Sequence, residues 1–91
     1  AIDLRIALAV ASSYRDQPLP EGVMSFGEVG LTGELRAVTA VSQRIHEAIR
    51  LGFTTCIMPK QDIGRMEIPK TFRIVQTENI AQAIGAAFGR K

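Results

Sequence analysis

Aromatic, cysteine and histidine residues are scarce in this sequence of 91 residues, which has no tryptophan, one tyrosine, one cysteine and one histidine. A single cysteine forms no internal disulfide, and with a single histidine it cannot complete the four-ligand set of a structural zinc site. Cys56 lies in the apolar run TTCIMP, which favours a buried structural thiol over a nucleophile. With so few aromatic side chains, stacking on nucleic-acid bases is excluded as a main activity.

Long apolar runs and targeting signals are also missing. No stretch approaches the roughly 18 consecutive apolar residues of a membrane span. The first residues include Asp3 and Arg5 and do not resemble a signal peptide. We therefore expect no membrane partner, and the lone cysteine fits the reducing conditions of the cytoplasm.

Common catalytic and nucleotide-binding motifs are absent as well. The chain contains no Walker A motif. None of the four serines lies in a G-x-S-x-G elbow: Ser12, Ser13, Ser25 and Ser42. All three lysines fall in predicted loops or at the chain end, which argues against serine–lysine chemistry. His46 has no cysteine or second histidine near it and is therefore a poor metal ligand.

What the sequence does contain is typical of one small folded domain, residues 1–91. Apolar residues make up 46% and charged residues 22%, so disorder is not expected. Helices are predicted over residues 1–16, 39–52 and 77–89, and strands over 23–31, 31–38, 53–59 and 71–76. The alternation after residue 39 predicts an α/β fold with crossover connections.

Expectations about the helix ends follow from local sequence. The 1–16 helix is nearly apolar all round and starts without a cap, so we expect it to be buried on most sides and residues before Ala1 to belong to the same domain. Thr39 or Ser42 is the expected N-cap of the second helix, and Gly52 its C-terminal glycine. Thr77 is the expected N-cap of the third helix.

The stretch FGEVGLTGELR, residues 26–36, places three glycines at a spacing of three: Gly27, Gly30 and Gly33. A dinucleotide-binding loop has the spacing G-x-G-x-x-G and leads from a strand into a helix, whereas this segment leads into a predicted strand. A tight strand–turn–strand element is therefore expected. Glu28 and Glu34 are candidates for an acid–base pair, but exposed hairpin glutamates are the simpler interpretation.

Positive charge is the remaining candidate for function. The chain has eleven basic and nine acidic residues, and a net charge of +2 permits a nucleic-acid surface without requiring one. Arg36, Arg44 and Arg50 gather around the second helix and are the candidate nucleic-acid-binding residues, with Lys60 and Arg65 on a later loop. Such a patch would contact the DNA backbone rather than the bases. A solvated or subunit-contacting surface is the alternative.

The motif GEVGLTGELR, together with AIDLRIALAVASS, RDQPLPEG and RIHEAIRLGFTTCIMPK, resembles the C-terminal Lon-protease-like domain of the RadA/Sms family of bacterial DNA repair proteins. The resemblance runs from Ala1 to about Pro59, with weaker support from TENIAQAI. It implies an α/β (α+β) fold like the Lon proteolytic domain, of the ribosomal-protein-S5-domain-2 class, truncated at the N-terminus. One departure is Ala37, where that family often has proline.

The resemblance also bears on catalysis. Lon proteases carry a catalytic serine just before the first helix, at a position that would precede Ala1, and a catalytic lysine near the start of the second helix. Ser42 occupies the lysine position, and no lysine is near it. The resemblance therefore implies a protease-like domain without catalytic residues. An active serine–lysine peptidase fragment is the alternative, which a serine before Ala1 would favour.

Members of the resembled family are recombination and repair ATPases that form hexameric, ATP-driven motors on branched DNA, with zinc-binding and RecA-like regions that this chain lacks. The resemblance implies a homo-oligomer, contact with the DNA backbone and no enzymatic activity or cofactor in these 91 residues; ATP, Mg and Zn are expected in the parent protein. A pure oligomerisation module without DNA contact is the third interpretation.

Overall fold

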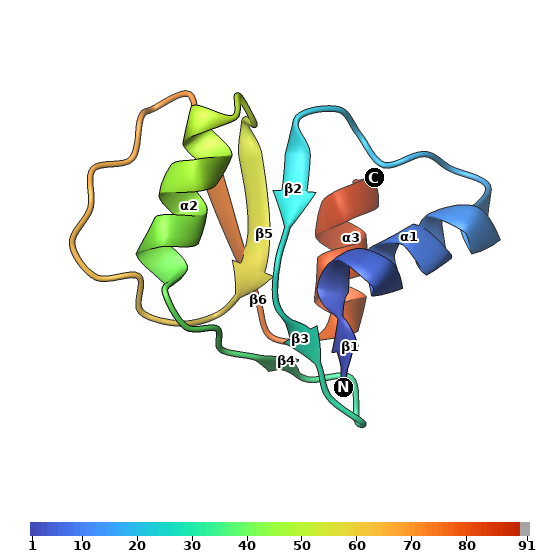
Figure 1. The fold of residues 1–91 in the computed structure, drawn as a ribbon. Helices are drawn as coiled ribbons and strands as arrows, with labels where there is room; N and C mark the ends of the chain where they lie inside the picture. Colours follow the sequence, from blue (N-terminus) through green and yellow to red (C-terminus); the bar gives the residue numbers. More distant parts are fainter. Residues whose placement is uncertain (90–91) are drawn as a thin grey trace.

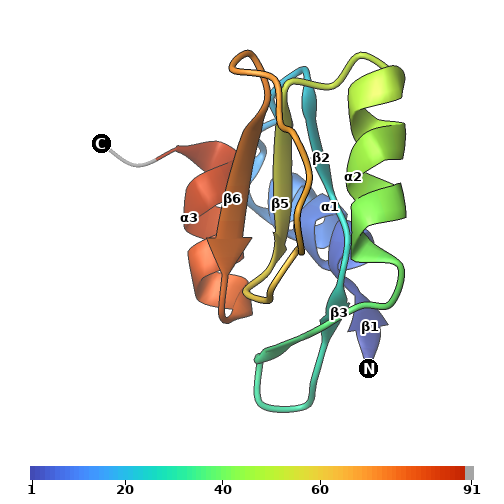
Figure 2. The same cartoon turned by 90° about the vertical axis from the view of Figure 1, so that its left-hand side faces the viewer.

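A parallel sheet of three strands forms the centre of the molecule in the computed structural model, which describes residues 1–89 (Figure 1). The strands β2 (Val23–Ser25), β5 (Thr55–Pro59) and β6 (Arg73–Thr77) lie in the order β2-β5-β6. The helix α2 (Val41–Arg50) covers one face (Figure 2), and α1 (Leu4–Arg15) and α3 (Ile80–Phe88) lie on the other. The predicted α/β class is confirmed.

Alternating side chains of β5 build a core on each face of this sheet. Ile57 packs with Leu4 and Leu8 of α1 and with the buried alanines of α3. Cys56 and Met58 point the other way, into a second core with α2. All three β5 side chains are fully buried, as expected for the central strand of a parallel sheet covered on both faces.

A small antiparallel sheet lies below the parallel one and contains the glycine-rich motif. Its strands β1 (Ile2–Asp3), β3 (Glu28–Val29) and β4 (Leu35–Arg36) lie in the order β1-β3-β4. In the turn, the Gly30 N–H donates to the Glu34 carbonyl at 2.8 Å and the Gly33 N–H to the Gly30 carbonyl at 3.0 Å. The predicted strand–turn–strand element is confirmed.

The predicted strand over residues 23–31 is divided between the two sheets. Phe26 still belongs with the parallel sheet, because its N–H donates to the Ile57 carbonyl at 3.2 Å. Gly27 then adopts a φ of +136°, which a side chain would disfavour, and the chain turns into β3. The predicted strand over 31–38 is likewise reduced to Leu35–Arg36. One apolar run therefore serves two sheets.

Two expectations about the first helix are wrong. It begins at Leu4 and is capped, because the Asp3 carboxylate accepts a hydrogen bond of 2.8 Å from the Arg5 N–H. It is also buried on only one side: Leu8 is 1% exposed, whereas Ile6 is 55% and Val10 61% exposed. Among residues 1–89, nothing covers the apolar stripe that Ile6 and Val10 form.

The N-cap predictions for the other two helices are also wrong. Ala40, not Thr39 or Ser42, is the N-cap of α2, with a left-handed backbone and no side-chain cap. Asn79 caps α3 by accepting a hydrogen bond from the Gln82 N–H at 2.9 Å.

Thr77 cannot cap α3 because it still belongs to β6, where its hydroxyl lies 3.3 Å from the Met58 carbonyl that accepts its hydrogen bond. The prediction for the end of the second helix is confirmed: Gly52 follows the C-cap Leu51 with a φ of +95°.

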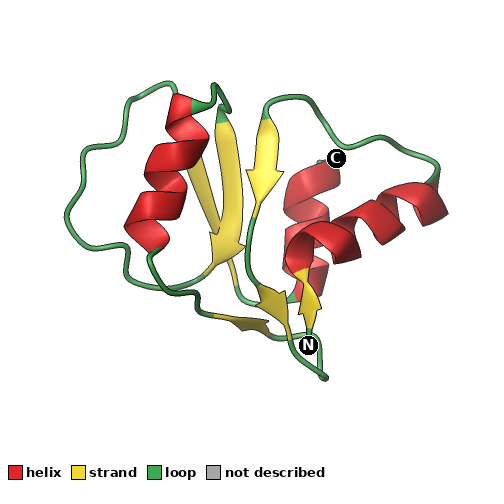
Figure 3. Ribbon diagram, in the orientation of Figure 1, coloured by secondary structure: helices red, strands yellow, loops and turns green. Residues whose placement is uncertain are grey.

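Two long loops connect these elements (Figure 3). Residues 16–22 lead from α1 to β2, and residues 60–72 join the parallel neighbours β5 and β6 without a helix. Ile63, Met66 and Ile68 of the second loop pack against the α2 core and take the place of a crossover helix. None of the helices between residues 1 and 89 is long and apolar enough to cross a membrane.

Candidate functional site

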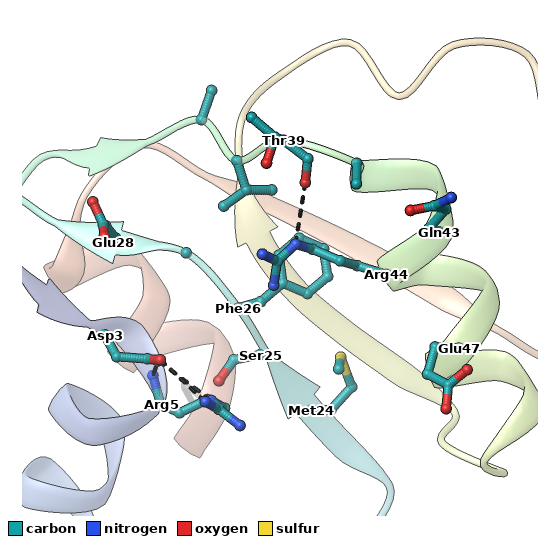
Figure 4. A pocket seen from close by; sticks show the side chains of 14 residues that line it. Asp3, Arg5, Met24, Ser25, Phe26, Glu28, Thr39, Gln43, Arg44 and Glu47 are labelled. Carbon is teal, nitrogen blue, oxygen red and sulfur yellow. Dashed lines mark hydrogen bonds and ion pairs between the residues drawn. The ribbon is translucent and has the colours of Figure 1, made fainter.

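A hollow of about 780 Å³ opens beside β2, between the N-terminal ends of α1 and α2 (Figure 4). Its lining comes from four parts of the chain: Asp3 and Arg5, residues 24–28, residues 37–40, and the polar side of α2 at Gln43, Arg44 and Glu47. The fold brings these parts together because β2 is the edge strand of the parallel sheet and both helices begin next to it.

Ser25 lies on β2 in the wall of this hollow and is only 7% exposed. Its neighbours Met24 and Phe26 face the α2 core, so Ser25 points to the other side of the strand. Within residues 1–89, the Ser25 hydroxyl has no hydrogen-bond partner, although its wall position leaves it accessible from the hollow. It is therefore a polar group open to a ligand.

Asp3 and Arg5 form a closed ion pair at the start of α1. The Asp3 carboxylate accepts from the Arg5 backbone N–H at 2.8 Å, from Nε at 3.3 Å and from Nη2 at 3.1 Å. The hydrogen bonds from the Arg5 side chain and backbone lower the pKa of Asp3, with a smaller contribution from Arg44. The charge of Arg44 is thus felt at the Asp3 side of the hollow.

Arg44 is held by two contacts on the opposite side. Its Nε–H donates to the Thr39 carbonyl at 3.2 Å, and its guanidinium carbon lies 5.7 Å from the centre of the buried Phe26 ring. Among the described residues, no carboxylate lies within 4.0 Å of its guanidinium nitrogens. Arg44 is therefore a positioned cation without an acidic partner.

The other two predicted arginines are engaged elsewhere. Arg36 on β4 lies 3.5 Å from the Glu34 carboxylate, and Arg50 in the last turn of α2 pairs with Glu47. Neither lines the hollow. Arg5, which does, was not among the predicted site residues, although it is the one charge within the apolar stretch of the first helix and that interruption was the available signal.

Further candidate residues from the sequence analysis lie outside the hollow. Ser42 lies half-buried in the first turn of α2, away from the hollow, and His46 is exposed on the same helix. Cys56 is fully buried and burial raises its pKa to about 12, which confirms the predicted structural thiol. Within residues 1–89, no group of three or more potential metal ligands is brought together.

The structure does not favour the alternative interpretation of Glu28 and Glu34 as an acid–base pair. In the β3–β4 ladder, Arg36 lies opposite Glu28. The Thr32 hydroxyl hydrogen-bonds to the Glu34 carboxylate and, with backbone N–H groups and Arg36, lowers its pKa. A general acid–base pair needs one carboxyl with a raised pKa, and Glu34 is shifted in the opposite direction.

Comparison with known proteins identifies the family. The family model described as subunit ChlI of Mg-chelatase matches residues 1–62, which contain the whole lining of the hollow. The chain belongs to this ChlI family. The match includes α1, β2, α2 and the whole of β5, so the family segment is the one that builds the candidate site.

Individual relatives of this ChlI-family chain carry the name DNA repair protein RadA. The chain is 43% identical to the protein of Streptococcus pyogenes serotype M1 over 88 residues, which is 97% of the chain and 19% of the relative. It is 45% identical to that of Listeria monocytogenes over 87 residues (96% and 19%), and 40% to that of Halalkalibacterium halodurans over 90 residues (99% and 20%).

These matches confirm the resemblance to RadA that GEVGLTGELR indicated. Over nearly its whole length, the chain corresponds to part of RadA and is a domain related to DNA repair proteins. It spans about one fifth of the length of these relatives.

Proposed function

We propose that the chain is a non-catalytic, Lon-like domain of a RadA/Sms-type DNA repair and recombination ATPase, and that it serves ring assembly and contacts the DNA backbone. The observation that carries this proposal is the 40–45% identity to proteins named DNA repair protein RadA across 96–99% of the chain. The mixed α/β architecture is compatible with the Lon-like, ribosomal-protein-S5-like fold class that the resemblance implies.

The absence of peptidase activity is supported by the residues around α2. Ser42 stands at the position of the Lon lysine, and the helix contains no lysine. Lys60 follows β5, outside this helix, and its ammonium group lies 3.4 Å from the Glu78 carboxylate. Lys70 lies in the loop before β6.

This part of the proposal is tested on the full-length protein with a fluorophosphonate probe and an unfolded protein substrate. We expect neither covalent labelling within this domain nor cleavage. Labelling of a serine in this domain, with cleavage that the probe abolishes, would instead establish the active serine–lysine peptidase.

Ring assembly and DNA contact are supported by two surfaces. The exposed apolar stripe of α1, with Ile6 and Val10, suits a protein contact. The arginines on β4 and α2 suit a phosphate backbone: Arg36, Arg44 and Arg50. In this proposal the parent protein is a cytoplasmic hexamer, and ATP, Mg and Zn bind outside these 91 residues.

Salt-dependent duplex binding by the full-length protein tests the DNA contact. We expect the triple variant R36A/R44A/R50A to bind duplex DNA more weakly and with a smaller salt dependence, while sedimentation shows an unchanged ring. Unchanged DNA binding would favour the pure oligomerisation module.

A further inference from the structure

We propose that Arg44 clamps one phosphate group of the DNA backbone in the hollow between α1 and α2, whereas Arg36 and Arg50 do not contact DNA individually. This inference rests on the DNA contact proposed above and assigns it to one side chain. The hollow in Figure 4 offers the phosphate a positioned guanidinium from α2.

The geometry of Arg44 leaves its anion-binding end free. The Nε–H is used by the Thr39 carbonyl, and the Phe26 ring supports the guanidinium plane at 5.7 Å. The four N–H groups of the two terminal nitrogens have no hydrogen-bond partner among residues 1–89. A guanidinium held in this way presents two parallel donors, the arrangement that binds two phosphate oxygens with little further loss of side-chain freedom.

The charges around the hollow single out Arg44. Arg5 is bonded to Asp3, Arg36 to Glu34 and Arg50 to Glu47, so an anion reaching those arginines would compete with a carboxylate. Arg44 has no such competitor within 4.0 Å in the described part of the chain.

The hollow also contains acidic side chains, which must be considered for an anionic ligand. Asp3 and Glu47 are paired with Arg5 and Arg50, whereas Arg36, which lies opposite Glu28 in the ladder, is paired with Glu34. Among the lining residues, the charges left without an ion pair are thus the carboxylate of Glu28 on β3 and the guanidinium of Arg44 on α2, and the phosphate belongs at the α2 side of the hollow.

The test compares Arg44→Gln with Arg50→Gln in the full-length protein. Both substitutions remove one charge from α2, but Arg50 is already paired and lies outside the hollow. The affinity for a short duplex is measured by fluorescence anisotropy between 50 and 200 mM KCl, and sedimentation monitors the ring. We expect Arg44→Gln to reduce the slope of log affinity against log salt by about 0.9, the value for one phosphate contact, and Arg50→Gln to leave it unchanged.

The substitution Arg44→Lys keeps the positive charge but removes the pair of parallel N–H donors. We expect this variant to retain the salt slope but to bind DNA several-fold more weakly, because an ammonium group cannot donate two parallel hydrogen bonds. Full affinity in Arg44→Lys would overturn the clamp.

The remaining outcomes distinguish this inference from the proposed function. Equal small losses for Arg44→Gln and Arg50→Gln would refute the clamp and leave a diffuse DNA contact in place. No loss for either variant or for R36A/R44A/R50A would refute DNA contact as a whole. Loss of the ring with an unchanged slope in Arg44→Gln would refute the phosphate and identify a carboxylate of a neighbouring subunit as the partner of Arg44.

Discussion

Replacing Ala40 by glycine should stabilise the domain, although the substitution adds no contact. Ala40 is the N-cap of α2 and has φ +56° and ψ +40°, the left-handed region. An L-residue pays roughly 1–2 kcal/mol for this conformation, and glycine does not. Because glycine is also more flexible in the unfolded chain, about 0.4–1 kcal/mol of this gain is lost again. Ala40 is exposed, so its methyl group contributes little burial.

The expected net gain is about 0.5–1 kcal/mol, which corresponds to a rise in Tm of about 2–8 °C for a domain of this size. Urea unfolding and calorimetry of the wild type and Ala40→Gly measure it. Ala37→Gly is the matched control, since Ala37 is exposed in the same segment but is not among the residues with positive φ. It should lose about 0.4–1 kcal/mol. If both variants lose stability equally, Ala40 does not hold the left-handed conformation in solution and the reasoning is wrong.

Three further predictions concern helix capping, thiol reactivity and the core. Asp3→Ala should destabilise the domain by about 1 kcal/mol at pH 7 through loss of the α1 cap. Because the folded pKa of Asp3 lies below its ordinary value of 3.8, this contribution is present above pH 4 and lost as the pH falls through the lowered pKa, so urea midpoints of variant and wild type should converge at low pH. Cys56, with a pKa raised to about 12, should react with iodoacetamide at pH 8 about a thousandfold more slowly than in urea; equal rates would show that β5 is not buried. Ile57→Ala should cost about 2–5 kcal/mol in urea unfolding, and a loss below 1 kcal/mol would contradict the packing against α1 and α3.

The sequence predicted most accurately those helices and strands in which the spacing of the apolar residues matches the buried face. The stripe of α2 is an example: Ile45 and Ala48 are both fully buried, as their spacing indicates. The apolar run around Cys56 is likewise the central strand. In both segments the local pattern and the tertiary contacts agree.

The incorrect predictions concern helix caps and strand boundaries that depend on tertiary contacts. Thr77 has a good capping side chain, but its pairing in β6 holds it two residues before the cap position, which Asn79 occupies. The division of residues 23–31 depends on where β5 ends, because Gly27 must turn away beside Pro59. The sequence of residues 23–31 contains no pattern that indicates this contact with Pro59.

The candidate site was predictable only in part for the same reason. Arg44 was identified from charge alone, but its distinction from Arg50 depends on which carboxylates lie near each of them. Arg5 and Arg44 are far apart in the sequence and line one hollow only because β2 lies at a sheet edge between two helix starts. Periodicity along the chain carries no information about that juxtaposition.

The small antiparallel sheet has a consequence for the motion of the domain. Each of its strands contributes only two residues, whereas β5 and β6 pair over five. Local opening should therefore begin at the hairpin, and its amide hydrogens should exchange with solvent long before those of β5. The GEVGLTGELR segment that identifies the family would thus lie on the part of the domain that opens and recloses most often, next to a rigid parallel sheet that stays closed until the whole domain unfolds.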